Sequence, residues 1–406
     1  MQLFVARQPI FNTSRKVIAY ELLFRRENQP AYDGDDGDRA TEAVIVNSFL
    51  AIGMDVLTNG KRAFINFTDQ GLKNRIAELL PAELVAVEIL ESVEPEAAVL
   101  AACRQLKKKG YLLVLDDFIF RPGYEPLIEL ADVIKIDFLL TPAGERAKIV
   151  QQFGGRSGLK FLAEKVETER DFQEAVRSGY HYFQGYFFSK PVVISRKSIP
   201  FGQVAAFRLL KAVHAAVLNL NQVEAIIREE VAFSYQLFKY INSSAFNLRK
   251  EIHSIRHALV LLGQRELQKW ASLMALRNMG ETKPQELLVA SLLRAHLSEL
   301  VAGRLKTAPI AADAFLTGLL SLMDAVLDQP MTDIIAELPL RKEINAALAG
   351  ESNIFHDILT LCIAYERAEW DEIFRLVDKL GLDEAELPGL MLNALAAVGS
   401  ADIKHD

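Results

Sequence analysis

Two adjacent carboxylates, Asp116 and Asp117, directly follow the apolar run Leu112–Leu115. This pattern predicts a short buried strand that places both acids at its C-terminal end. Neighbouring carboxylates repel each other, and holding them together costs free energy unless a cation lies between them. The pair therefore indicates a metal site, although two aspartates after a strand can also open a turn or cap a helix.

Polar side chains stand at the ends of several other short apolar segments, and amphipathic helical stretches separate these segments. Alternating strands and helices indicate parallel strands with crossover helices. Seven or eight such pairs in about 190 residues fit a (β/α) barrel better than an open sheet. The C-terminal strand ends of a barrel converge on one mouth, so we expect the polar residues to line one cavity. These residues are Glu21, Asn66, Glu88, Asp116, Asp117, Lys135, Glu164, Glu167 and Gln184.

Oxygen ligands without His or Cys suit hard cations such as Mg²⁺ or Mn²⁺, and this set is large enough for two ions. Two metal ions can activate a water and stabilise both oxygens of a phosphodiester displacement. Lys135 could hold the water or offset phosphoryl charge, or it could form a salt bridge with Asp137 or a neighbouring acid. Either Glu164 or Glu167 could take the water's proton. Arg25 has the fork geometry that suits a phosphate.

The composition is that of a globular protein with two to three domains, because half of the 406 residues are apolar and 24% are charged. A net charge of −7 argues against a general binder of DNA or RNA, but it allows a small nucleotide ligand. Two distant cysteines, Cys103 and Cys362, favour a reducing, cytoplasmic setting. The first seven residues lack the features of a signal peptide, and no apolar run predicts a membrane span.

A hairpin is predicted at the start of the chain, from strand patterns at Leu3–Ile10 and Lys16–Phe24 around a polar turn. The acidic stretch 33–38 lacks the final glutamate of a calcium loop, so it is predicted to be a disordered loop. Helical patterns follow at 40–57, Pro95–Lys109, Glu125–Ala131 and Glu167–Ser178.

Residues 1–195 resemble the EAL domain of cyclic di-GMP signalling proteins, a TIM-like barrel that opens the cyclic dinucleotide to linear pGpG with two divalent metals. Seven motifs carry the resemblance, and they occur in the order found in that family. They are Glu21-Leu22-Leu23 with Arg25, Phe64-Ile65-Asn66-Phe67-Thr68, Glu88-Ile89-Leu90-Glu91, Asp116-Asp117-Phe118, Lys135-Ile136-Asp137, Ala163-Glu164-Lys165-Val166-Glu167, and Gln184-Gly185-Tyr186 with Ser189-Lys190-Pro191.

The resemblance implies a two-metal site for Mg²⁺ or Mn²⁺ and assigns a role to each matching residue. The first ion would be held by Glu21, Asn66, Glu88 and Asp116, and the second by Asp116, Asp117 and Glu164. Catalysis would involve Glu164 as base, Lys135 and Glu167; substrate binding would involve Arg25 and Gln184; Glu91 would anchor the neighbouring loop. The resemblance also implies that the barrel can form a homodimer.

Three positions depart from the family pattern. Leu22 replaces a small alanine and could crowd the guanine-side pocket, and Lys165 replaces a glycine beside Glu164. The family's Asp-Asp-Phe-Gly-Thr-Gly-Tyr-Ser loop, which helps to organise the second metal and the dimer interface, is altered over Ile119–Tyr124. Two interpretations therefore stay open. One is a cyclic di-GMP phosphodiesterase, and the other is a catalytically weak or inactive receptor for the nucleotide or a protein-interaction scaffold.

Beyond a predicted linker at 196–204, residues 205–400 resemble the HDOD domain, an all-helical, HD-related output module. The resemblance rests on motifs at 237–246, 252–255, 258–263 and 314–320. Helices are predicted most clearly at Phe207–Leu218, Val223–Glu230, Tyr235–Ile241, Ile255–Leu262 and Gln264–Arg277.

The helical half lacks the residues of an active HD hydrolase. Such an enzyme would need a His-Asp pair after the last motif, where this chain has Ser321-Leu322. His356-Asp357 lies elsewhere, and we interpret it as an ordinary helical pair. His253, His257 and His296 are interpreted as packing or surface residues. We therefore expect this half to regulate the barrel or bind an unidentified protein partner, without metal chemistry of its own.

Overall fold

The computed structural model describes residues 3–26, 54–187, 201–215, 217–243, 246, 252–280, 283–305 and 310–400. The predicted acidic loop at 33–38, most of the helix expected at 40–57 and most of the predicted linker lie outside these residues. Contacts within the chain divide it into two units. The first comprises residues 1–190, 364–374 and 383–406, and the second comprises residues 191–363 and 375–382.

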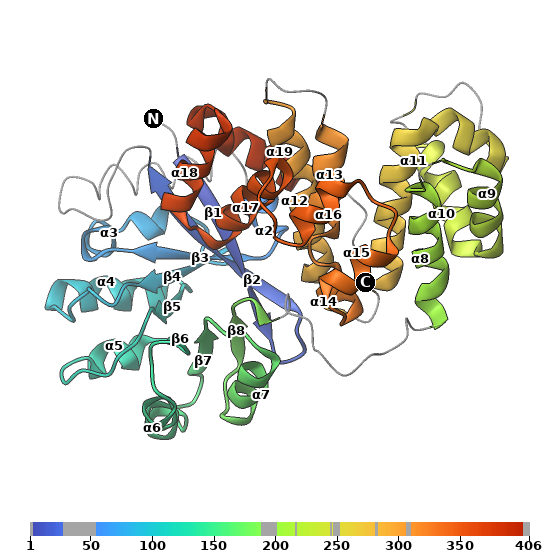
Figure 1. Ribbon diagram of the computed structural model, residues 1–406. Coiled ribbons are helices and arrows are strands. Elements are labelled where there is room, and N and C mark those ends of the chain that lie inside the picture. Colours follow the sequence, from blue (N-terminus) through green and yellow to red (C-terminus); the bar gives the residue numbers. More distant parts are fainter. Residues whose placement is uncertain are drawn as a thin grey trace. The chain divides into compact units, whose positions relative to one another are not determined.

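Eight strands of the first unit close into a barrel in sequence order (Figure 1). They are β1 Leu3–Asn12, β2 Val17–Arg26, β3 Arg62–Phe67, β4 Val85–Ile89, β5 Leu112–Leu115, β6 Val133–Asp137, β7 Lys160–Glu164 and β8 Tyr182–Gln184. Strand β1 is antiparallel to both β2 and β8, and the pairs from β2 to β8 are parallel. The predicted barrel and its N-terminal hairpin are confirmed.

Short helices connect the parallel strands, as predicted. They are α2 Met54–Thr58, α3 Asp69–Lys73, η1 Ile76–Leu79, α4 Ala97–Lys108, α5 Glu125–Leu130, α6 Ala143–Phe153 and α7 Glu169–Arg177. Thr168 caps the N-terminus of α7, and its side chain forms a reciprocal capping box with Asp171 that satisfies two backbone donors. Every residue of β4 and β6 is buried, as expected for barrel strands that are covered on both faces.

The second unit is helical, which confirms the predicted fold class of a barrel followed by an all-helical region. Its helices are α8 Phe201–Val213, α9 Leu220–Glu229, α10 Val231–Ile241, α11 Ile255–Met279, α12 Gln285–Ala302, α13 Ala311–Leu320, α14 Met323–Leu327, α15 Met331–Glu337, α16 Lys342–Leu348, and parts of α17 Ile354–Arg367 and α18 Trp370–Leu380. The two helices predicted on either side of Gly263 form α11, whose backbone leaves the helical conformation at that glycine. Among the described residues, no helix has the length and apolar character needed to cross a bilayer.

The C-terminal residues pack within the first unit. Phe4 of β1 makes edge-on contacts with Trp370 and Phe374, at ring-centroid distances of 6.2 and 5.6 Å. The Tyr186 hydroxyl donates a hydrogen bond to the Glu366 carbonyl at 3.1 Å. Helix α19, Leu387–Ser400, also contacts β1 and α2. The division at 1–195, 196–204 and 205–400 stays a prediction, and these contacts add residues from the end of the chain to the barrel unit.

Candidate active site

The strands bring the candidate residues together through a two-residue repeat. A layer of apolar side chains, one from each of the first seven strands, fills the barrel: Ile10, Ala19, Phe64, Ala86, Val114, Val133 and Leu162. Two residues closer to the mouth, each strand or its immediate end carries a polar residue: Gln8, Glu21, Asn66, Glu88, Asp116, Lys135 and Glu164. Tyr182 and Gln184 have the same spacing on β8. Because side chains two residues apart point to the same face of a strand, these polar groups form the next interior layer.

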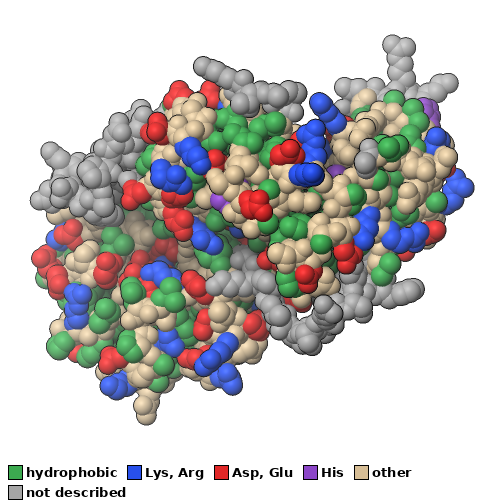
Figure 2. Space-filling model, in the orientation of Figure 1, with side chains coloured by type: hydrophobic (Ala, Val, Ile, Leu, Met, Phe, Trp, Pro, Cys, Tyr) green, Lys and Arg blue, Asp and Glu red, His purple; other side chains and the backbone are tan. Residues whose placement is uncertain are grey.

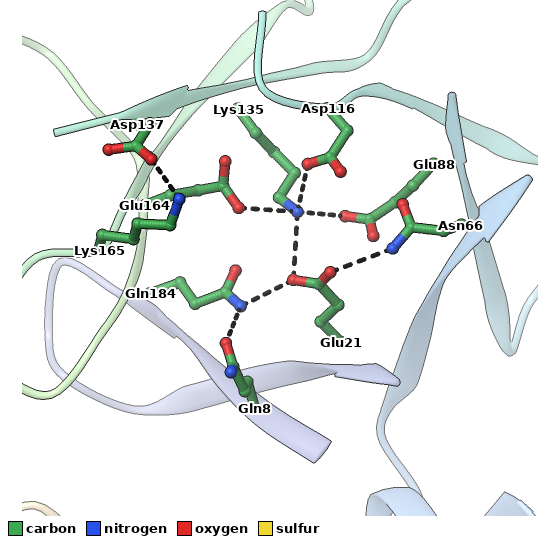
Figure 3. A network of polar contacts seen from close by, with 10 residues as sticks. All are labelled: Gln8, Glu21, Asn66, Glu88, Asp116, Lys135, Asp137, Glu164, Lys165 and Gln184. Atoms are coloured by element: carbon green, nitrogen blue, oxygen red, sulfur yellow. Dashed lines mark hydrogen bonds and ion pairs between the residues drawn. The ribbon is translucent and has the colours of Figure 1, made fainter. Parts of the chain in front are cut away.

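Lys135 lies at the centre of four carboxylates, as Figure 3 shows. Its Nζ is 2.7 Å from Asp116 Oδ1, 2.9 Å from Glu164 Oε1, 3.0 Å from Glu88 Oε1 and 3.1 Å from Glu21 Oε2. The Lys135 side chain is only 1% exposed. Four carboxylates and one ammonium carry a formal charge of −3. We call these four acids the carboxylate cluster.

Glu21 accepts hydrogen bonds from three side chains of the mouth. Its donors are Lys135 Nζ at 3.1 Å, Gln184 Nε2 at 2.7 Å and Asn66 Nδ2 at 3.3 Å. Gln184 Nε2 also donates to Gln8 Oε1 at 2.8 Å. Burial raises the pKa of Glu21, but the charge of Lys135 and the three hydrogen bonds outweigh it and lower that pKa. Glu21 is therefore the fixed anion of the cluster.

The other three acids are less stable as anions than Glu21 is. Burial, followed by repulsion from Glu21, raises the pKa of Glu88 well above its usual range. Burial also raises the pKa of Asp116, and that of Glu164 more strongly, against the opposing charge of Lys135. For Lys135 itself, burial lowers the pKa, but the four carboxylates outweigh burial and raise it well above its usual range. One ammonium is therefore not enough to stabilise all four carboxylates as anions.

The residues at the mouth fit a divalent metal ion. Carboxylate oxygens of Glu21, Glu88 and Asp116 all lie within 4.8 Å of one another, and among the described residues no other group of His, Cys, Asp or Glu does so. Several buried oxygens here accept no hydrogen bond: Asn66 Oδ1, Glu88 Oε2, Glu164 Oε2 and Gln184 Oε1. Unpaired buried oxygens are costly unless a ligand meets them, and Mg²⁺ and Mn²⁺ prefer such donors.

The pair Asp116-Asp117 separates at the strand end. The Asp116 amide donates to the Ile89 carbonyl at 3.0 Å, which continues the parallel pairing and keeps its side chain in the cluster. Asp117 has a left-handed backbone, with φ of 39°, and is not part of the three-carboxylate group. Left-handed conformations are tolerated by aspartate better than by most residues.

Asp137, one of the partners considered for Lys135, is held by other groups. Its Oδ2 forms an ion pair with Lys165 Nζ. Its Oδ1 accepts hydrogen bonds from the amides of Leu139 and Leu140, at 2.7 and 2.9 Å. Lys135 therefore pairs with neighbouring acids from four strands, as one of the alternatives expected, and not with Asp137.

The structure gives less detail for three further candidates. Arg25 pairs through its backbone with Phe4 in β2, and its side chain lies outside the described residues. Glu91 is exposed and, like Asp116, lines a small pocket beneath the loop after β5. Glu167 is half-buried just after β7. The roles expected for these residues stay predictions.

The altered loop after β5 is anchored by aromatic packing. Phe118 and Phe120 contact Phe153 of α6, with centroid distances of 6.5 and 5.7 Å. Tyr124 is buried at the end of the loop, whereas the Ile119 side chain is 64% exposed. The substituted loop is thus a packed structure whose residue 119 faces solvent.

Sequence reasoning missed two contributors to the site. Gln8 supports Gln184 from the antiparallel strand, and its place two residues before the core residue Ile10 was the available signal. Lys165 stands out in the sequence only as a departure from the family glycine, and no sequence pattern indicates its ion pair with Asp137.

The chain is similar to known proteins in both halves. Models of the EAL domain and the HDOD domain match residues 54–191 and 199–349. The uncharacterised protein YuxH of Bacillus subtilis is 39% identical over 95% of this chain and 96% of its own length. Cyclic di-GMP phosphodiesterase CdgJ of Vibrio cholerae is 35% identical over 94% of this chain and 88% of its own length. The chain belongs to the EAL–HDOD family.

Among solved structures, the EAL–HDOD chain matches a standalone EAL protein from Vibrio cholerae in its c-di-GMP-bound form. The two are 20% identical with a TM-score of 0.39, and the match covers 47% of this chain and 92% of the other.

In the HDOD domain, a hydrogen-bonded serine occupies the position where an active HD hydrolase would have its His-Asp pair. Ser321 Oγ accepts from Arg294 Nη1 at 3.2 Å and donates to the Gly318 carbonyl at 2.7 Å. The other pair lies on α17, where Asp357 forms an ion pair with Lys379 at 2.7 Å and His356 contacts Thr360. These contacts agree with the interpretation of His356-Asp357 as an ordinary helical pair.

On the face drawn in Figure 2, acidic and basic side chains are interspersed, without a broad basic surface.

The Gly185 that follows Gln184 in the EAL barrel is expected to be irreplaceable. Its φ is +137°, and an added Cβ would lie 2.2 Å from the Val166 carbonyl oxygen. We expect Gly185→Ala to lower the free energy of unfolding by about 2 kcal/mol or more. Gly110→Ala is the control, because Gly110 also has positive φ but has open space around it, so about 1 kcal/mol is expected. Equal losses in urea unfolding of the two variants would contradict the steric argument.

Proposed function

We propose that this EAL–HDOD protein hydrolyses cyclic di-GMP to linear pGpG in a reaction that depends on Mg²⁺ or Mn²⁺. The observation that carries the proposal is the buried carboxylate cluster around Lys135, with unpaired oxygens beside it. The sequence match to the relative CdgJ, which is named as a cyclic di-GMP phosphodiesterase, covers 94% of this chain. Together they support metal-assisted phosphodiester hydrolysis at the barrel mouth.

The proposed ligands of the first ion are Glu21, Asn66, Glu88 and Asp116. Those of the second ion are Asp116, Asp117 and Glu164. When bound, the ions would act as Lewis acids toward the phosphodiester and make a water nucleophilic at neutral pH.

The chain's own residues would hold the carboxylate cluster in place and deprotonate the attacking water. Lys135 supplies a fixed positive charge that keeps the carboxylate cluster together in the barrel interior. Glu164 has a pKa raised chiefly by burial and an oxygen, Oε2, that accepts no hydrogen bond. Because Oε2 accepts no hydrogen bond from the protein, it is available to take the proton of the attacking water.

The remaining candidates are proposed to hold the substrate and the surrounding loops. Arg25 would bind a phosphate, Gln184 would contribute to substrate binding through its unpaired Oε1, Glu167 would support Glu164, and Glu91 would anchor the loop after β5. The HDOD domain is proposed to bind a protein partner, and the barrel to form a homodimer.

Purified protein incubated with cyclic di-GMP and Mn²⁺ should give pGpG, measured by chromatography. Addition of excess EDTA should abolish the product. Glu164→Gln should reduce turnover by about 10²-fold or more, because it removes the proposed base. Glu129→Gln makes the same chemical change at an exposed residue of α5 and should leave turnover unchanged. No product with either Mn²⁺ or Mg²⁺ at high protein concentration would contradict the proposal.

A non-catalytic receptor is the second candidate, favoured by the altered loop at Ile119–Tyr124 and by Lys165 beside Glu164. Calorimetry with cyclic di-GMP in Ca²⁺ separates the cases. Binding without turnover in Mg²⁺ or Mn²⁺ would indicate a receptor, and absence of both would indicate a protein-interaction scaffold.

A further inference from the structure

Lys165 has a backbone conformation that would suit glycine better. Its φ is 52°, in the left-handed region. The backbone on both sides is fixed, because the Phe138 amide donates to the Glu164 carbonyl at 3.0 Å and the Val166 amide donates to the Gln184 carbonyl at 2.9 Å. A non-glycine residue in this region costs conformational free energy. The chain therefore keeps a long side chain at a position where the backbone disfavours one.

The Lys165 ammonium lies among carboxylates of the barrel mouth. It forms an ion pair with Asp137, which is only 3% exposed and is also held by two backbone amides. Lys165 directly follows Glu164 in the chain, and the charges of Asp117 and Glu164 also attract its ammonium. Figure 3 shows the side chain passing beside Glu164 to reach Asp137. Lys165 is thus a second cation of the site, on the side away from Glu21.

Two of the carboxylates that attract Lys165 are proposed ligands of the second metal ion. We propose that Lys165 is a built-in cation that weakens binding of the second divalent ion, so that the protein binds its two ions with unequal affinity. The inference rests on the proposed two-metal function and concerns the site of Asp116, Asp117 and Glu164. A fixed positive charge near these ligands repels an incoming divalent cation and reduces the negative charge available to bind it. The first site, around Glu21 and Asn66, lies on the other side of Lys135 and should be affected little.

The size of the expected effect on the affinity of the second ion follows from the exposure of the Lys165 ammonium. The Lys165 side chain is 49% exposed, so solvent screens its charge, and an effect of about tenfold on the affinity of the second ion is expected. Lys165→Met removes the charge and retains a side chain in the left-handed conformation. Lys165→Gly removes the charge and the backbone strain together. Lys165→Arg retains the charge.

Calorimetric titration of the metal-free, full-length protein with Mn²⁺ tests the inference without relying on turnover. The wild type should bind one ion tightly and a second at least about tenfold more weakly. Lys165→Met and Lys165→Gly should both tighten the second ion about tenfold and leave the first within about twofold. Lys165→Arg should behave as the wild type. Lys148→Met, which removes an ammonium whose side chain is 75% exposed on α6, is the matched control and should change neither ion.

Two results would overturn the inference and are distinguishable from failure of the proposed function. If the wild type binds two ions with equal affinity, or if Lys165→Met and Lys165→Gly bind the second ion as the wild type does, Lys165 has no such role while the two-metal site stands. If the wild type binds no Mn²⁺ at all, the proposed function fails, and the inference fails with it. A gain in the second affinity in Lys165→Gly but not in Lys165→Met would assign the effect to the backbone and also overturn the inference.

Discussion

Replacement of Lys135 by methionine will destabilise the metal-free protein by about 3–5 kcal/mol and abolish turnover. The reason is that the Lys135 ammonium is fully buried and contacts four carboxylates within 3.1 Å. Removal of one member of a buried ionic network leaves the other charges without compensation in a poorly solvated interior. Methionine has a similar length and an apolar stem, so the loss reports the charge and not a cavity.

Mg²⁺ should restore part of the stability that Lys135→Met loses, because a divalent cation can balance the same carboxylates. The measurement is equilibrium urea unfolding of wild type and variant, each in EDTA and in excess Mg²⁺. Lys107→Met is the control, since the Lys107 ammonium pairs with the partly exposed Asp132 and should contribute about 1 kcal/mol or less. Similar losses in the two variants, or a loss in Lys135→Met that Mg²⁺ leaves unchanged, would contradict this account of the cluster.

The barrel and most of its mouth could be predicted because both follow from short-range rules. From β3 to β7, apolar segments of four to six residues alternate with helices, and each segment has a polar residue at or near its C-terminal end. The two-residue period of a strand then fixes which face each polar residue takes. Ala19 and Glu21, Phe64 and Asn66 thus point inward together.

Which of the acids would pair with Lys135 could not be predicted in the same way. Glu21 and Lys135 are 114 residues apart in sequence, and their contact depends on the closure and register of the whole barrel. Sequence spacing placed Asp137 as a candidate partner because it is two residues away. In the structure, Asp137 is held by Lys165 and by the backbone amides of the following turn.

The assignment of the C-terminal residues shows a different limit. Periodicity shows that a helix has an apolar face, but it does not identify the surface that covers that face. Trp370 and Phe374 belong to an ordinary amphipathic pattern, and only the structure shows that they pack on Phe4 of the first strand. Motif order and periodicity therefore do not show which residues the C-terminal helices contact.

Replacement of Glu21 by glutamine will lower divalent metal affinity and turnover by more than about a hundredfold while leaving the fold intact. Glu21 accepts hydrogen bonds from Lys135, Gln184 and Asn66. Glutamine has nearly the same shape, but its amide nitrogen is a donor and must face at least one of these donors. The substitution also removes one of the cluster's four negative charges, so the site attracts a cation less strongly.

The measurements for Glu21→Gln are Mn²⁺ affinity by calorimetry and pGpG formation by chromatography, with far-UV circular dichroism to confirm folding. Glu129→Gln is again the matched control, because it makes the same change on an exposed helix surface. If a folded Glu21→Gln protein bound Mn²⁺ as tightly as the wild type, Glu21 would not be a metal ligand. If metal affinity fell but turnover did not, hydrolysis would not depend on the ion held by Glu21. Loss of both, with the control unaffected, is the result that links the buried carboxylates to metal binding and catalysis.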